Sequence, residues 1–387
     1  MDKFDIVVCG GGSAGFGAAL NAARGGAKTI LIEQTGGLGG VLTSGCVGYC
    51  MDVSTEHTIL QDIRKLAIVP KNTMASCFMI DIEEMKYYLE KELGNAGVTI
   101  MYHTKITGVQ KEQKKITGIY THSKSGEQLI KGTIFIDCTG DGDVGFFAGC
   151  SYEEGLNGKC QPMSFNVVIS GLNYEEVKDC VSNNREMYCE DAKANLLQEF
   201  QRAGFSPSYP KCTLGLMNGD LFTFSINHQY GAKGTSERDV TLATIKGRDE
   251  VFKAVAALRS LGGRWGNIKV VNSPAYIGVR EGRRLKGQYT ITKEDLMNGA
   301  EHKDAICKVK FCVDIHNEDG YTDGGIRTRP YDIPIRSLIS AQIDNFFMAG
   351  RCISGDFYAH ASYRVSGNTF VMGEQIGRYC ANIIKKM

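Results

Sequence analysis

One short stretch near the N-terminus restricts the fold more than any other part of the chain. An apolar run at residues 5–9 leads directly into Gly10-Gly11-Gly12-Ser13-Ala14-Gly15, and an Ala-rich segment follows as far as Arg24. A second apolar run, residues 28–32, ends in Glu33. Continuous apolar runs of this length are typical of strands buried on both faces of a parallel sheet. The sequence therefore predicts a strand–helix–strand unit whose helix opens at a glycine-rich turn.

The turn fits the G-x-G-x-x-G pattern, and each part of it has a physical role. Gly10 allows the tight turn, Gly12 lets the backbone approach a pyrophosphate, and Gly15 permits close packing of helix on strand. The helix N-terminus offers N–H groups and partial positive charge to phosphates, and Glu33 can accept hydrogen bonds from ribose hydroxyls. The pattern predicts a dinucleotide site that includes Gly10, Gly12, Ser13, Ala14, Gly15, Glu33 and Gln34.

The segment that follows carries a resemblance to a known class. After Glu33 the chain runs Gln34-Thr35-Gly36-Gly37-Leu38-Gly39-Gly40-Val41-Leu42-Thr43. Here it resembles FAD-dependent oxidoreductases of the glutathione-reductase-like class, in particular the flavoprotein subunits of fumarate reductase and their small soluble relatives. In those proteins a Gly-Gly-x-x-Thr/Ser stretch passes under the FAD pyrophosphate toward the flavin. The resemblance implies that Gly39, Gly40 and Thr43 bind FAD.

Three further segments match the same class. Val109 lies where these proteins hold the adenine, residues 134–143 resemble "I-D-A-T-G-D-G-D", and residues 343–351 resemble "V-D-N-L-L-V-A-G-R". Where the wider class has an acid that binds the ribityl chain, this chain has Arg351, and Asp356 is an alternative for that role. The resemblance covers most of 1–155 and 331–387. It adds Val109, Thr139, Gly140, Asp141, Gly350 and Arg351 to the expected FAD-binding residues.

The C-terminal segment, residues 354–369, precedes an expected helix that runs to about Lys385. In the class it crosses the flavin, and the helix N-terminus points at the N1/O2 edge, which is anionic in reduced flavin. The helix dipole and the N–H groups of Gly367, Asn368 and Thr369 would stabilise that charge.

This segment also supplies the candidate catalytic residues. His360, Tyr358 and Tyr363 are candidate proton donors or acceptors, and a histidine titrates near neutrality. Arg364 is a candidate clamp for a substrate carboxylate or a flavin oxygen. The competing interpretations are a packed histidine, pocket-lining tyrosines and a structural ion pair.

The expected fold is α/β: a Rossmann-type FAD-binding domain formed by 1–155 and 331–387, with an α+β substrate or cap domain, 156–330, inserted between them. The first domain combines a parallel sheet with a small antiparallel layer at 98–135. The insert should contain a polar helix at about 174–203 and a second helix at about 236–261. A second G-x-G-x-x-G unit is absent from the sequence, so a built-in NAD(P)H domain is not expected.

Several other residues remain open. Arg280-Glu281-Gly282-Arg283-Arg284 resembles an element of the class and serves either as a salt-bridged link between domains or as an anion site. His228 and His316, as isolated histidines, are interpreted as surface or packed residues. Cys46 and Cys50 follow the flavin-side glycines and are a candidate redox pair, although enzymes that reduce disulfides usually place their cysteines differently.

Composition narrows the function. Lys and Arg total 44 against 43 Asp and Glu, which argues against a dedicated nucleic-acid binder. No apolar run reaches the roughly 18 residues of a membrane span, and no signal peptide is expected. The fourteen cysteines lack metal-site spacing, so we expect no metal, and reduced thiols in the cytoplasm.

The function expected from these features is hydride transfer between flavin N5 and a carbon of a small organic substrate. A flavin-dependent thiol–disulfide or cofactor-modifying enzyme and a non-catalytic flavin redox carrier are the alternatives. The sequence does not identify the substrate or the electron donor or acceptor, and it leaves open whether the chain forms a homo-oligomer.

Overall fold

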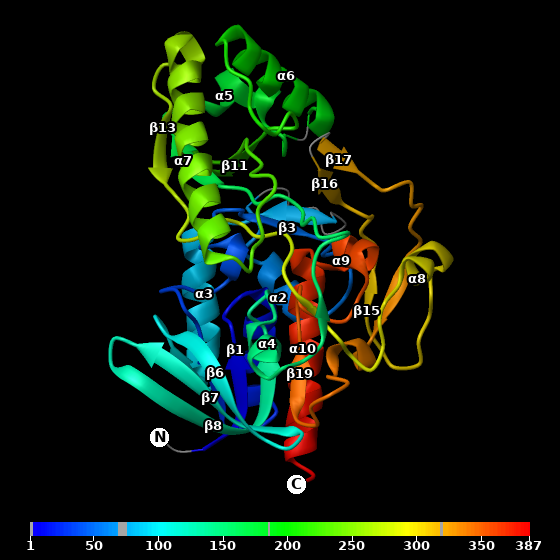
Figure 1. Cartoon of the computed structure of the whole chain (residues 1–387). Coiled ribbons are helices and arrows are strands. Elements are labelled where there is room, and N and C mark those ends of the chain that lie inside the picture. Colours follow the sequence, from blue (N-terminus) through cyan, green and yellow to red (C-terminus); the bar gives the residue numbers. More distant parts are fainter. Residues whose placement is uncertain (1–2, 69–75, 185, 318–319) are drawn as a thin grey trace.

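A parallel sheet forms the centre of the lower half of the molecule (Figure 1). The structure is a computed structural model that describes residues 3–68, 76–184, 186–317 and 320–387. The strands lie in the order β5-β2-β1-β8, and β19 pairs with the other side of β8. Their bounds are β1 Phe4–Cys9, β2 Thr29–Ile32, β5 Thr99–Met101, β8 Gly126–Asp137 and β19 Phe346–Met348. β2 is buried along its whole length, as its apolar run predicts, and so is β19.

Two helices, α1 (Ser13–Arg24) and α10 (Ser366–Ile384), pack side by side at this sheet. Glycines allow their backbones to approach closely. A Cβ atom on Gly373 would lie 2.1 Å from the carbonyl oxygen of Ala14, and one on Gly377 would lie 2.4 Å from that of Ala18. The two helices run in the same direction, so their N-termini lie at the same end of the sheet.

A small antiparallel layer extends the sheet beyond β8. β6 (Lys105–Glu112) pairs with β7 (Lys115–Ser123), and β7 pairs with the first half of β8. Asn345 fixes this layer to the parallel sheet, because its side chain bonds to both the N–H and the carbonyl of Ile116 and to the carbonyl of Thr133. The expected antiparallel layer is confirmed over residues 105–131, whereas β5, which lies within the expected range 98–135, pairs parallel with β2.

The upper half contains an antiparallel sheet in the order β11-β12-β10-β13, with α5, α6 and α7 beside it (Figure 1). The strands are β10 Val167–Ser170, β11 Thr213–Asn218, β12 Leu221–Ser225 and β13 Lys269–Asn272, and the helices are α5 Tyr174–Val177, α6 Cys189–Arg202 and α7 Glu237–Ser260. Ser236 caps α7, since its hydroxyl accepts the N–H of Asp239. The expected helix at about 236–261 is confirmed.

The single expected helix at about 174–203 is wrong. The structure has α5, a 3-10 turn at Lys178–Cys180, and then α6 from Cys189. Between them the chain leaves the helical path because it bonds to β11 instead. Val181 forms a bridge with Leu214, and the Asn183 side chain bonds to both the N–H and the carbonyl of Leu216.

Apolar residues form two main cores. One extends from Met163 to Ile277 and belongs to the upper half. The other combines residues 4–150 with residues 285–381, so the segment from Leu285 onward packs with the parallel sheet. The division of the chain at 155 and 330 stays a prediction.

Shorter elements complete the described structure. They are α2 Thr58–Arg64, α3 Ile82–Asn95, α4 Asp143–Phe147, α8 Lys293–Asn298, α9 Phe357–Tyr363, β3 Tyr49–Met51, β4 Cys77–Met79, β9 Tyr152–Glu153, β14 Arg284–Leu285, β15 Ala305–Val309, β16 Ile315–Asn317, β17 Gly320–Thr322 and β18 Tyr331–Pro334, with 3-10 turns at Gly40–Leu42, Gly263–Trp265 and Ile335–Leu338.

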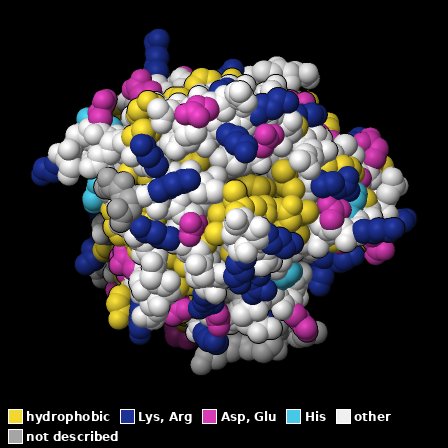
Figure 2. Space-filling model, turned by 90° about the horizontal axis from the view of Figure 1, so that it is seen from below, with side chains coloured by type: hydrophobic (Ala, Val, Ile, Leu, Met, Phe, Trp, Pro, Cys, Tyr) yellow, Lys and Arg dark blue, Asp and Glu magenta, His cyan; other side chains and the backbone are white. Residues whose placement is uncertain are grey.

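On the lower face of the molecule, basic and acidic side chains are interspersed around a central apolar patch (Figure 2). In the part of the chain that the structure describes, no helix combines the length and the apolar character needed to cross a bilayer.

Candidate functional site

The glycine turn predicted from the sequence connects β1 to α1. Gly10 has φ +101°, and a Cβ there would lie 2.4 Å from the carbonyl oxygen of Cys138. A Cβ on Gly15 would lie 1.8 Å from the carbonyl oxygen of Gly10. At Gly12, by contrast, the nearest atom to a Cβ is 4.0 Å away, so the backbone is open on that side. The turn has the close packing and the exposed backbone that the pattern requires.

The helix that follows is suited to an anion. Its N-cap, Gly12, makes no side-chain capping bond, and its first turn, which includes Ser13 and Ala14, contains no acidic residue. The N–H groups of the first turn therefore have no side-chain acceptor from the cap, and the helix dipole favours negative charge there. This end of α1 fits a pyrophosphate.

Glu33 follows β2 beside the turn. Its carboxylate accepts the N–H of Gly11 at 2.7 Å and both the N–H and the hydroxyl of Thr35 at 2.7 and 2.8 Å. The neighbouring Gln34 is exposed. Glu33 is thus fixed next to the glycine turn, where the sequence predicts ribose binding. Val109, the residue expected to hold the adenine, lies on β6. The N–H that donates to the Glu33 carbonyl belongs instead to Thr104, five residues before Val109.

The second glycine segment lies against the first. The N–H of Gly39 donates to the Gly11 carbonyl at 2.9 Å, and Gly12 and Gly39 form a parallel bridge. A Cβ on Gly40 would lie 3.0 Å from Gly12 Cα, so glycine is needed for this approach. The buried Thr43 hydroxyl donates to the Leu38 carbonyl.

Two other strand ends reach the same place. Gly350, which follows β19, has φ +95°, and a Cβ there would lie 3.2 Å from Ala14 Cβ. The Arg351 guanidinium lies over Gly140 and pairs with Asp141 at 2.9 Å. The ends of β1, β8 and β19 therefore surround the first turn of α1, and the expected residues meet although they are distant in the sequence.

Some of these residues already have protein partners. Both the N–H and the hydroxyl of Thr139 donate to Asp137, whose pKa burial raises to about 6. Asp356, the alternative ribityl-binding acid, caps α9 by accepting the N–H of Ala359 at 2.8 Å and also accepts that of Lys293 at 2.6 Å. These contacts organise turns at the edge of the site.

Tyr276 is a further residue of the site, and it was not among the residues predicted from the sequence. It comes from the segment after β13, and its hydroxyl would be 3.4 Å from a Cβ on Gly40. Burial raises its pKa, and the nearby Glu33 carboxylate adds to the effect. The upper half of the molecule thus contributes a phenol next to the glycine segments, and no local pattern in the sequence signals this.

The N-terminus of α10 adjoins that of α1. The hydroxyls of Ser13 and Thr369 are hydrogen-bonded at 2.6 Å. Like α1, α10 lacks a side-chain N-cap and has no acid in its first turn. A Cβ on Gly367 would lie 2.2 Å from the carbonyl oxygen of Asp52, and the buried Asn368 Nδ2 has no hydrogen-bond partner in the described structure. Two adjacent helix N-termini fit two anionic groups of one extended cofactor.

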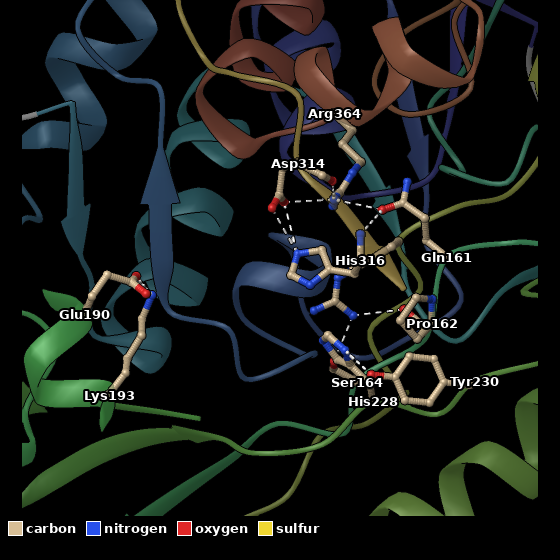
Figure 3. Close-up of polar contacts among 11 residues, drawn as sticks. Gln161, Pro162, Ser164, Glu190, Lys193, His228, Tyr230, Asp314, His316 and Arg364 are labelled. Atoms are coloured by element: carbon tan, nitrogen blue, oxygen red, sulfur yellow. Dashed lines mark hydrogen bonds and ion pairs between the residues drawn. The ribbon is translucent and has the colours of Figure 1, made fainter. Parts of the chain in front are cut away.

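A buried polar cluster lies between this end of α10 and the upper half (Figure 3). Arg364, at the C-cap of α9, pairs with Asp314 at 2.9 Å and contacts Gln161 Oε1 at 3.5 Å. Asp314 also contacts His316 Nε2 at 3.0 Å, and the N–H of His316 donates to Gln161 Oε1. These contacts join Arg364 to two segments that the sequence left unconnected.

The cluster continues toward β10 and β12. Arg280 donates to the Pro162 carbonyl at 2.9 Å and to the Ser164 hydroxyl at 2.8 Å. His228, which is 2% exposed, stacks on Tyr209 with 3.9 Å between ring centroids and meets the edge of the His316 ring at 4.9 Å. The histidines interpreted as isolated therefore belong to one polar site. The Glu190–Lys193 pair lies apart, at the left of Figure 3.

Burial sets the charge of this cluster. It lowers the pKa of His228 and lowers that of His316 to about 4, and in both cases the Arg280 charge adds to the effect. Burial alone would raise the pKa of Asp314, but the His316 hydrogen bond and the Arg364 charge hold it below its usual value. Near neutral pH, both histidines are neutral, and the two arginines exceed the single carboxylate by one positive charge.

The other predicted catalytic residues lie beside the cluster rather than in it. His360 is fully buried, neither ring nitrogen has a hydrogen-bond partner in the described structure, and burial lowers its pKa. The Tyr363 hydroxyl donates to the Ile353 carbonyl at 3.0 Å. Tyr358 lies under the Lys293 ammonium at 5.2 Å. Of the four, Arg364 is the one that hydrogen-bonds into the cluster.

The residues of the Arg280–Arg284 segment make two kinds of contact. Arg280 enters the polar cluster. Glu281, 1% exposed, accepts a bond from Arg284 at 2.5 Å and another from the N–H of Gln161 at 3.0 Å. Arg283 pairs with Asp143 at 2.9 Å. The salt-bridge interpretation is thus supported by the pairs of Arg283 and Arg284, whereas anion binding at Arg280 stays a prediction.

The thiols are ordinary. Cys46 and Cys50, the candidate redox pair, are both free thiols. Burial raises the pKa of Cys46 to about 11 and that of Cys50 to about 12, whereas reactive cysteines have lowered values. Among the described residues, no group of three or more His, Cys, Asp or Glu side chains is arranged to hold a metal ion.

Two known proteins are similar to part of this chain. A protein in the nifH2 5′ region of Methanosarcina barkeri, itself uncharacterised, is 24% identical over 165 residues, which are 36% of this chain and 83% of that protein. Mitochondrial dihydrolipoyl dehydrogenase of Pisum sativum is 30% identical over 160 residues, 40% of this chain and 31% of that enzyme.

Solved structures share the fold along the whole chain. The p-nitrophenol 4-monooxygenase PnpA from Pseudomonas putida matches with a TM-score of 0.55 and 11% identity, covering 100% of this chain and 82% of that one. A geranylgeranyl bacteriochlorophyll reductase-like protein from Thermoplasma acidophilum matches with a TM-score of 0.52 and 13% identity, covering 100% and 79%. The model of the FAD dependent oxidoreductase family matches residues 5–387, so the chain belongs to that family and its cofactor is FAD.

Proposed function

We propose that the protein transfers hydride between flavin N5 and a carbon of a small organic substrate that binds in the polar cluster. The observation that carries this proposal is the position of Arg364. It ends α9 two residues before α10 begins, and it hydrogen-bonds into a buried group of neutral histidines and arginines. A neutral histidine is suited to proton transfer, which must accompany hydride transfer to or from carbon.

In this proposal the chain's own residues bind the cofactor and shape the reaction. The N-termini of α1 and α10 hold the pyrophosphate and the flavin edge, and Glu33 holds the ribose. Bound FAD supplies the hydride acceptor or donor. Arg280 and Arg364 orient the substrate, and His228 handles its proton. His360 stays a proposed partner of the flavin, since both of its ring nitrogens are buried without a hydrogen-bond partner in the described structure.

The raised thiol pKa values of Cys46 and Cys50 argue against thiol–disulfide chemistry. The narrower resemblance to fumarate reductase flavoproteins stays a prediction. So do the dehydrogenase or reductase type, the cytoplasmic location, the separate electron partner and the homo-oligomer.

The test is reoxidation of the reduced holoenzyme without oxygen. FAD is photoreduced anaerobically, and organic acceptors such as keto acids and enoic acids are added one at a time. We expect the yellow colour to return with an acceptor that becomes reduced at carbon. If oxygen alone reoxidises the flavin and an oxygen atom enters an added substrate, the protein is a monooxygenase and the proposal is wrong.

A further inference from the structure

Several buried polar atoms in the cluster have no hydrogen-bond partner in the described structure, and together they indicate which kind of ligand would bind there. Its donors without an acceptor in the described structure are Gln161 Nε2 and Arg364 Nε. Arg280 has no carboxylate within 4 Å among the described residues, although burial and the neighbouring Arg364 lower its pKa to about 10. The two guanidinium groups share the site with one carboxylate, that of Asp314, because the nearby Glu281 is already paired with Arg284. A buried charge without a counter-charge destabilises the folded protein, so we expect this end of the cluster to bind an anion.

At the other end of the cluster, His228 presents an acceptor atom, so we expect a hydrogen-bond donor to bind there. His228 Nδ1 lies 3.1 Å from the Tyr230 hydroxyl, and that hydroxyl donates to the Ser208 carbonyl at 3.3 Å. Because the tyrosine proton is used on the carbonyl, the hydrogen-bond network assigns the histidine proton to Nδ1. The lone pair is then on His228 Nε2, which is buried and has no partner in the described structure.

We propose that the cluster binds a small α-hydroxy acid, whose carboxylate is held by Arg280 and Arg364 and whose hydroxyl proton is taken by His228 Nε2. This inference rests on the proposed function and adds its substrate class and direction, which is oxidation of the substrate. An α-amino acid fits less well, because its ammonium group would lie beside two guanidinium groups.

The chemistry balances with the family's own cofactor as the oxidant. The hydroxyl O–H bond breaks and its proton moves to His228 Nε2. The C–H bond at the same carbon breaks, and its hydrogen leaves as hydride to oxidised FAD. A carbon–oxygen double bond forms, so the product is a 2-keto acid, and the two electrons lost by the substrate are gained by the flavin.

The charges in the cluster also explain selectivity. Burial and the charges of Arg280 and Arg364 keep the pKa of His228 low, so it is a weak base. A bound carboxylate offsets those charges and makes His228 a stronger base. A neutral alcohol of the same shape does not, so we expect the base to act well only when the anion is present.

The first part of the test measures binding without turnover. Calorimetric titration of the holoenzyme with oxalate, a planar dianion that cannot be oxidised in this way, reports the anion site. We expect Arg280→Met to weaken oxalate binding at least tenfold. We expect His228→Asn, which retains a donor toward Tyr230, to change it less than threefold. Arg336→Met is the matched control, because Arg336 is 45% exposed and pairs with Asp304. Equal binding by the wild type and Arg280→Met would overturn the proposal.

The second part measures flavin bleaching in the absence of oxygen. Glycolate, both enantiomers of lactate and of malate, and the neutral matches lactamide and 1,2-propanediol are mixed with the oxidised holoenzyme. We expect at least one hydroxy acid to bleach the flavin and His228→Asn to slow this about 100-fold or more.

The outcomes separate the two proposals. If the neutral compounds bleach the flavin as fast as the acids, hydride transfer stands and the anionic substrate class is wrong. If oxalate binds through Arg280 but none of the acids bleaches the flavin, the anion site stands, whereas His228 as base and oxidation as the direction are wrong.

Discussion

The buried ion pair between Glu281 and Arg284 provides a quantitative test of how the segment after β13 is held. Arg284 is 3% exposed and Glu281 is 1% exposed. Besides their contact at 2.5 Å, Arg284 donates to the carbonyls of Gly355 and Gly155, both at 3.1 Å. Arg284→Met keeps most of the side-chain volume but leaves the Glu281 carboxylate buried without its cation. Breaking a buried pair in this way costs about 3–5 kcal/mol.

We expect Arg284→Met to lower the free energy of unfolding by about 3–5 kcal/mol at pH 8, as measured by urea denaturation of the holoenzyme. The deficit should shrink at pH 5. Burial already raises the pKa of Glu281, and loss of the arginine raises it further. The protonated carboxyl is then the favoured native form, so native stability recovers as the pH falls.

A double-mutant cycle isolates the pair. Glu281→Gln alone leaves the Arg284 charge buried, whereas the double variant removes both charges. We expect the double variant to be more stable than the sum of the single losses predicts, by about 1–3 kcal/mol. A loss below about 1 kcal/mol for Arg284→Met, or additive effects within about 0.5 kcal/mol, would refute this account.

Three more predictions concern the cofactor, pH and the upper core. Gly15→Ala places a methyl 1.8 Å from the Gly10 carbonyl oxygen, so we expect FAD affinity in equilibrium dialysis to fall at least tenfold. Gly94→Ala, with no atom within 4 Å, is the control, and equal loss in both would contradict the argument. The His316 pKa of about 4 lies below its ordinary value, about 6.5, so stability falls from pH 6.5 toward 4 as the unfolded chain binds the extra proton. By pH 5 we expect the free energy of unfolding, measured by urea denaturation, to fall by about 2 kcal/mol more in the wild type than in His316→Gln. Equal falls in the two proteins would be contrary evidence. The single tryptophan, Trp265, is buried in the upper core, so its emission should follow a different urea transition from FAD release, and coincident curves would show that the two cores unfold together.

The grouping of the expected cofactor-binding residues in space could be predicted because their signals are local. The glycine turn, Glu33 and the strand ends at 139–141 and 350–351 each occupy a few consecutive residues whose types are fixed by backbone approach or by charge. Parallel strand ends meet at one edge of a sheet, so adjacency in space followed from the fold. Val109 had no such local geometry, and the residue whose N–H bonds to the Glu33 carbonyl is Thr104.

The polar cluster could not be predicted in the same way. Gln161, His228, Arg280, Asp314 and Arg364 come from five separate segments of the chain, and most lie in irregular connections where no periodicity indicates direction. His228 and His316 were interpreted as isolated because each has apolar and polar neighbours in the sequence but no ligand-like spacing.

The expected helix at 174–203 failed for a related reason. Its polar composition favours a helix, but the Asn183 side chain supplies bonds to β11 that only the tertiary structure reveals. Side chains of this kind compete with helical hydrogen bonds wherever a strand edge is within reach.

The glycine-lined contact between α1 and α10 has a consequence for synthesis of the chain. The hydroxyl of Ser13 bonds to that of Thr369, more than 350 residues later in the sequence, so the two helix N-termini can pair only after Thr369 has been synthesised. The upper core, by contrast, draws on one continuous stretch from Met163 to Ile277. During synthesis we therefore expect the upper half to fold before α10 leaves the ribosome, and FAD to bind after α10 has docked on α1.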